Sequence, residues 1–210
     1  MKTIEKNPKK VKIFEILLAI GLALFLLTGV WSLHRQQNLA DKVVRLHILA
    51  NSDSQTDQTL KLQVRDRLLA RATEILEASG DRAEAEKLLT AALPELQTLA
   101  AEEIEARGYQ YPVTAELTDS DFPTKEYDGF TLPAGEYLAL RIVIGQGNGH
   151  NWWCVVFPPL CTQTTTDVPA AAMAAGLNED DLALITEENS GYVLKFKALE
   201  WWSALKEKVA

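Results

Sequence analysis

The sequence predicts an α+β protein, in which an N-terminal transmembrane or signal helix is followed by one domain with a mainly antiparallel sheet and two long helices. Three observations favour this class. An apolar segment without any charge runs from Ile16 to Leu33. Two segments, roughly 54–78 and 81–107, have apolar residues at helical spacing. After residue 112, short segments rich in β-branched and aromatic residues have short connections, which favours antiparallel pairing.

The segment Ile16–Leu33 would form ~27 Å of helix, close to the thickness of a bilayer's hydrocarbon core. Five lysines and two glutamates precede it, and such a basic flank stays in the cytoplasm. We expect residues 1–33 to be the cytoplasmic flank and membrane or signal segment, 34–42 a linker, and 43–210 an extracytoplasmic domain. No small-residue cleavage site follows directly. A retained anchor is therefore favoured, although the sequence leaves cleavage open.

The domain begins with a predicted strand, Val43–Ala50, whose alternate residues face opposite sides. A polar turn follows at 51–54, and Ser54 or Thr56 can cap the first long helix, which should end near Ala78. The apolar stripe of this helix comprises Leu60, Val64, Leu68, Ala72, Ile75 and Leu76.

The second long helix is bounded by Gly80, which ends the first helix, and by Asp81, which caps its own N-terminus. Pro94 should kink or split it, and Gly108 should end it. Its apolar face comprises Leu89, Leu93, Leu96, Ala100 and Ile104.

Four strands are predicted next: Val113–Leu117, Glu126–Phe130, Tyr137–Ile144 and Trp152–Phe157. The glycine-rich sequence GQGNG at 145–149 links the last two. A strand follows this sequence, whereas a phosphate-binding loop needs a helix, so a hairpin loop is expected. The remaining predicted elements are short helices at Ala170–Ala175 and Glu179–Thr186, a strand at Tyr192–Phe196 and a helix at Ala198–Val209.

The charge balance excludes several partners. The whole chain carries −8, and residues 1–33 contribute +3, so the remainder carries −11. Such a domain repels nucleic acid and anionic lipid headgroups.

The sequence shows no pattern of metal ligands. The three histidines are widely spaced, and a calcium-binding loop that starts at Asn51 would need other residues at Thr56 and Leu62. We therefore expect no metal, no cofactor and no small-molecule substrate.

The segment 151–161 (NWWCVVFPPLC) holds both cysteines and two of the five tryptophans. Alternation along a strand places Trp152 and Cys154 on one face, and Trp153, Val155 and Phe157 on the other. Pro158-Pro159 ends the strand. In an extended chain the Cα atoms of Cys154 and Cys161 would lie over ~20 Å apart, so a disulfide requires that the prolines reverse the chain. A disulfide and two buried thiols are both compatible with the sequence.

A dense polar array at residues 45–65 would lie at a strand-to-helix corner, where partners often bind. Asp57, Lys61 and Arg65 repeat every four residues and are predicted on the exposed helix face. Tryptophan and arginine are also favoured at binding hot spots. The candidate receptor-contact residues are Arg45, His47, Asn51, Asp53, Asp57, Lys61, Arg65, Trp152 and Trp153. For each of them, a turn, cap or core role is the alternative.

An alternative function is an extracytoplasmic cysteine-dependent hydrolase that uses Cys154 with His47 or His150. His150 would lie ~13 Å away along an extended strand, which is a poor position. His47 could reach across the sheet, but no third group is recognisable. No catalytic residue is therefore predicted.

Two blocks, RLHILANSDSQTDQTLKLQVRDRLL (Arg45–Leu69) and LPAGEYLALRIVIGQGNGHNWWCVVFPPLC (Leu132–Cys161), closely resemble stage II sporulation protein R, a family of signalling proteins of endospore-forming bacteria. The resemblance implies a protein made in the forespore and exported into the space between the two membranes. It also implies a partner, a membrane-embedded aspartyl protease of the mother cell, which matures the precursor of sporulation sigma factor E. The chain would then be an activating ligand and not itself an enzyme. No individual contact residue follows from the resemblance.

Overall fold

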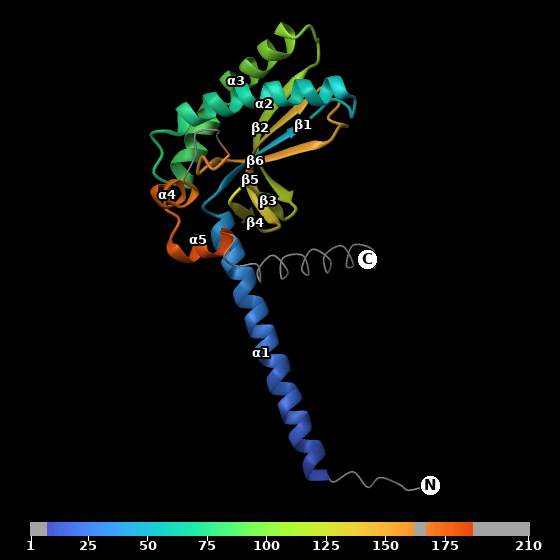
Figure 1. Cartoon of the computed structure of the whole chain (residues 1–210), viewed down its shortest axis with the longest axis vertical. Helices are drawn as coiled ribbons and strands as arrows, with labels where there is room; N and C mark the ends of the chain where they lie inside the picture. The colour runs from blue at the N-terminus through green and yellow to red at the C-terminus, as the bar shows by residue number, and fades with distance from the viewer. Residues whose placement is uncertain (1–7, 162–166, 187–210) are drawn as a thin grey trace, which may run out of the picture. The chain divides into compact units, whose positions relative to one another are not determined.

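The computed structural model describes residues 8–161 and 167–186 (Figure 1). The predicted strand Tyr192–Phe196 and helix Ala198–Val209 lie outside the described residues. The chain divides into two units, Met1–Asn38 and Leu39–Ala210.

Helix α1 (Pro8–Ala40) contains the apolar segment. Its residues 14–40 are long and apolar enough to cross a membrane, and a signal sequence has the same properties. The large apolar side chains from Phe14 to Leu33 are exposed. The helix continues through most of the predicted linker, and Leu39 and Ala40 are buried at the start of the second unit.

The four-stranded sheet of the second unit is mixed. It consists of β1 (Val44–Leu49), β2 (Val113–Phe122), β5 (Gly135–Ile144) and β6 (Asn151–Phe157), in the order β2-β5-β1-β6. Strand β1 runs parallel to β5 and antiparallel to β6, and β2 runs antiparallel to β5. The predicted mainly antiparallel sheet is confirmed, with one parallel pair at its centre.

The loop between β5 and β6 is not a hairpin loop, so this prediction is wrong. Strand β1 lies between β5 and β6, and residues 145–150 therefore cross the end of β1. Strand β1 pairs with two strands that lie far along the chain, and such distant pairing leaves no local signal in the loop sequence. The short connection therefore suggested that β5 and β6 pair directly.

Helices α2 (Gln55–Leu76) and α3 (Arg82–Ala106) cover one face of the sheet (Figure 1). Ser54 caps α2 by accepting from the backbone N–H of Asp57 at 3.2 Å, and Asp81 caps α3 in the same way. Helix α3 continues past Pro94 without being split. The main core lies between these helices and the sheet, and it includes Leu46, Ile48, Leu60, Val64, Leu68, Leu89, Leu96, Leu140 and Ile142.

The other face of the sheet is partly covered by β3 (Lys125–Tyr127) and β4 (Phe130–Leu132). These strands form a hairpin where a single strand was predicted, because Gly129 turns the chain at a φ of +80°. The short helices α4 (Val168–Ala174) and α5 (Glu179–Ile185) follow, and α5 packs against β4. A second core forms here from Leu39, Val43, Phe122, Phe130, Leu132, Tyr137, Val155, Leu160, Leu184 and Ile185.

Strand β6 carries a bulge that changes the predicted alternation. Arg45 pairs with Val155 whereas Val44 pairs with Phe157, so the register shifts by one residue. Phe157 consequently packs into the main core with Cys154, whereas Val155 packs into the second core. The bulge explains why strict alternation misplaced Phe157.

Candidate functional site

The polar corner between β1 and α2 is built around the carboxylate of Asp57. One oxygen of this carboxylate accepts from Ser52 Oγ at 2.6 Å and from Asn51 Nδ2 at 2.9 Å. Burial by itself would raise the pKa of Asp57, but the hydrogen bonds from Ser52, Asn51 and Tyr111 together lower it. The carboxylate is thus held in its charged form by donors that face inward.

The loop 145–150 is hydrogen-bonded to this corner along its length. The side-chain oxygen of Asn51 accepts from the backbone N–H of Gln146 at 3.0 Å. Asp53 accepts from the backbone N–H of His150 at 2.6 Å and pairs with its ring. Lys61 Nζ donates to the carbonyl of His150 at 2.8 Å. These hydrogen bonds therefore fix the crossing loop against the corner.

Glycine allows the loop to approach the corner closely. A Cβ at Gly149 would lie 2.3 Å from the carbonyl oxygen of Ser52. Gly145 has a φ of +60°, and a Cβ there would lie 2.2 Å from Oδ1 of Asn51. The GQGNG sequence is therefore explained by backbone contact with the corner.

Asp57 and Lys61 are each only 4% exposed, so their prediction as exposed surface is wrong. The helix period correctly places them off the apolar stripe, but the corner and the loop 145–150 bury them. Burial also lowers the pKa of Lys61. Asp53 is exposed and Asn51 is half-buried, so part of the predicted array does reach the surface.

Arg45 is fully buried, and its prediction as a surface contact is therefore also wrong. Its guanidinium lies over the ring of Phe122 at 4.0 Å and that of Tyr137 at 5.0 Å. Its Nη2 donates to the hydroxyl of Tyr127 at 2.6 Å, and this hydroxyl donates to the carbonyl of Trp153 at 3.2 Å. The sequence contains no local signal for Tyr127, because the hairpin that positions it lies 82 residues downstream.

His47 and Trp153 lie together on the second face of the sheet. Their ring centroids are 6.2 Å apart, and both side chains are half-buried. His47 Nε2 contacts the side-chain oxygen of Asn151 at 3.0 Å. Burial lowers the pKa of His47 and favours its neutral form. These two residues are candidates for contact, although on a different face from α2.

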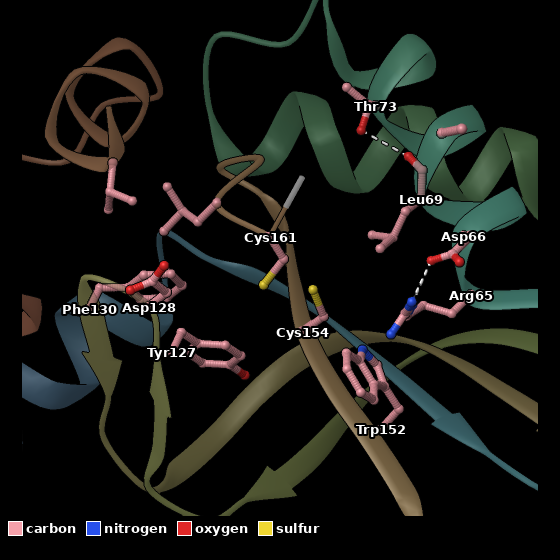
Figure 2. A pocket seen from close by; sticks show the side chains of 13 residues that line it. Arg65, Asp66, Leu69, Thr73, Tyr127, Asp128, Phe130, Trp152, Cys154 and Cys161 are labelled. Carbon is pink, nitrogen blue, oxygen red and sulfur yellow. Dashed lines mark hydrogen bonds and ion pairs between the residues drawn. The ribbon is translucent and has the colours of Figure 1, made fainter. Parts of the chain in front are cut away.

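Arg65 and Trp152 form a second accessible pair, on the helix side of the sheet. The guanidinium of Arg65 lies 4.3 Å from the centroid of the Trp152 ring and is also paired with Asp66 at 2.6 Å. Figure 2 shows this pair at the wall of a cavity of about 700 Å³. The cavity lies between α2, β6, the β3–β4 hairpin and the segment that includes Leu160 and Cys161.

Cys154 and Cys161 line the same cavity as free thiols, so the candidate disulfide is not formed in the structure. The chain does reverse at the prolines, as a bridge would require, and the two sulfur atoms face each other (Figure 2). The neighbouring thiol of Cys154 lowers the pKa of Cys161, whereas Cys161 together with burial raises the pKa of Cys154.

The structure does not assemble the alternative cysteine–histidine site. Cys154 pairs with Leu46 and points to the main core, whereas the neighbouring His47 points to the opposite face of the sheet. The ring of His150 contacts Asp53 at the loop 145–150. Within the described residues, no group of three or more His, Cys, Asp or Glu side chains is arranged to hold a metal ion.

Two sequence comparisons identify the family of this chain. The family model described as "Stage II sporulation protein R (spore_II_R)" matches residues 40–167, which cover β1 to β6. The chain is also 34% identical over 190 residues to stage II sporulation protein R of Bacillus subtilis (strain 168), and this match covers 80% of the chain and 83% of that protein. No solved structure matches. On both measures the chain belongs to the stage II sporulation protein R family.

Proposed function

We propose that this protein is an exported sporulation signal, made in the forespore, that activates a membrane-embedded aspartyl protease of the mother cell. That protease then matures the precursor of sigma factor E. Membership of the stage II sporulation protein R family is the observation that carries this proposal. The apolar helix α1 supports it, because such a helix can serve as a signal or an anchor.

The described surface suggests where the receptor binds. Arg65 and Trp152 combine a planar cation and a large ring at the wall of an open cavity, and such residues dominate binding energy at interfaces. Three other candidates have a structural role and do not reach the surface, since all are buried: Arg45, Asp57 and Lys61. We therefore place the receptor contact at Arg65 and Trp152, with the His47–Trp153 pair as a separate second region.

The test is co-expression of the chain with the protease and the sigma precursor, with precursor cleavage as the readout. Arg65→Ala should reduce cleavage by about tenfold or more, the effect of removing a binding hot spot. Arg67→Ala is the matched control, because this arginine lies on the same helix with a 52% exposed side chain and a 4.0 Å ion pair to Glu103.

The two outcomes that count against the proposal are distinct. If the wild-type chain causes no cleavage, the signalling function itself is wrong. If Arg65→Ala and Trp152→Ala both signal fully at an unchanged thermal midpoint, the function stands and the contact lies on another surface.

A further inference from the structure

Cys154 and Cys161 are paired across the reversal of the chain that follows β6. Cys154 is on the strand, and Cys161 follows the Pro158-Pro159 turn. Figure 2 shows their sulfur atoms pointing toward one another inside the cavity. Both cysteines line this one cavity, so the reversal of the chain already brings together the two side chains that a disulfide would join.

The two thiols have different environments. Cys161 Sγ accepts a hydrogen bond from the backbone N–H of Val155 at 3.2 Å, whereas Cys154 Sγ donates to the carbonyl of Val155 at 4.0 Å. Arg45 and Arg65 also favour its thiolate. Cys154 is only 2% exposed, and the neighbouring Cys161 together with burial raises the pKa of its thiol, whereas Cys161 is half-buried. Accessible thiolate character therefore belongs to Cys161.

The cavity gives a reagent access to Cys161. Its volume of about 700 Å³ is within the range of small-molecule and peptide side-chain sites. The charged and titratable groups on its wall are Arg65 and Asp66 from α2, and Tyr127 and Asp128 from the hairpin.

We infer that Cys154 and Cys161 form a reactive dithiol that exchanges with disulfides, in which Cys161 attacks and Cys154 resolves. The Cys161 thiolate attacks one sulfur of a small or peptide disulfide, which forms a mixed disulfide and releases the first thiolate. Cys154 then loses its proton to solvent and attacks the sulfur of Cys161, which releases the second thiolate. The chain loses two electrons and two protons and gains one disulfide, and the external disulfide is reduced to two thiols.

This activity does not depend on the proposed signalling function. It also explains why the two thiols face each other in an open cavity. Cysteines that only fill a hydrophobic core would not need such a position. Outside the cytoplasm such a pair meets oxidising partners.

The test uses the full-length chain in detergent, reduced, freed of reductant, and exposed to oxidised glutathione. The samples are quenched in acid, the remaining thiols are alkylated, and the mass of the intact chain is measured by mass spectrometry. The wild-type chain should lose two hydrogens and both free thiols without retaining glutathione, at a rate independent of chain concentration. Cys154→Ser should stop as an adduct of one glutathione on Cys161. Cys161→Ser should react at least about tenfold more slowly, because the remaining thiol is buried and protonated.

Two results would overturn the inference. One is a wild-type chain that accumulates a glutathione adduct on each cysteine without forming the internal disulfide. The other is a Cys161→Ser variant that reacts as fast as the wild type while the thermal midpoint of both is the same. The wild-type measurement stands by itself if either variant fails to fold.

Discussion

Asp57 accepts hydrogen bonds from two side chains of the preceding turn and is buried, which gives this residue a structural role. We predict that Asp57→Ala lowers the free energy of unfolding by about 1–3 kcal/mol, because Ser52 and Asn51 lose their acceptor. Urea unfolding of the two chains measures the difference. Glu74→Ala is the control, because its ion pair with Arg71 is exposed to solvent, and exposed pairs contribute little to stability. Equal losses in both variants would contradict a special role for Asp57.

The same carboxylate predicts a dependence on pH. The pKa of Asp57 in the folded chain lies below the reference value of 3.8. The ionised carboxylate therefore stabilises the native state relative to the unfolded state. This stabilisation is complete above the reference value and is lost as the pH falls through the folded pKa. The stability difference between the wild type and Asp57→Asn should therefore be fully present near pH 7 and shrink as the pH falls below 3.8. If urea unfolding gives the same difference at pH 7 and at the acid end of the titration, the carboxylate of Asp57 does not have this role.

At the scale of elements, the loop 145–150 crosses the end of β1 and is fixed by contacts with the 51–54 turn. Gly149→Ala would place a methyl group against the carbonyl of Ser52, so the loop must move. We expect a loss of about 1–3 kcal/mol, typical of overpacking. Thermal unfolding should show this loss.

A glycine outside the loop provides the matched control. A Cβ at Gly80 would meet only the flexible carboxylate of Glu84, at 3.7 Å. Gly80→Ala should change stability by less than about 0.5 kcal/mol. Indistinguishable thermal midpoints for the two glycine variants would show that the loop does not depend on close approach.

At the scale of the whole molecule, the folded unit begins at Leu39. A chain that starts at residue 39 should unfold cooperatively and remain in solution without detergent, because the exposed apolar residues of α1 are removed. A chain that starts at residue 44 also loses Leu39 and Val43, both fully buried. Burial of each contributes about 1.5–3 kcal/mol, so this shorter chain should be clearly less stable. Calorimetry of both chains would reveal equal stability if the unit instead begins at β1.

The sequence by itself determined the long helices, the strands of the four-stranded sheet and the family. Apolar periodicity predicted α2 and α3, the caps Ser54 and Asp81 were confirmed, and the Pro158-Pro159 pair ended β6 as expected. These signals are local, since each depends on residues within one or two turns of the chain. The charge-free segment Ile16–Leu33 likewise predicted a helix of membrane-spanning length.

Only the tertiary structure decided which polar residues are buried and which strands are neighbours. Arg45 and Asp57 have the sequence pattern of surface residues, yet Tyr127 and the 51–54 turn provide their partners inside the fold. Cys154 and Cys161 face each other because the chain reverses after β6. Burial and pairing depend on segments far apart in the sequence, and the free energy that selects them comes from packing them together.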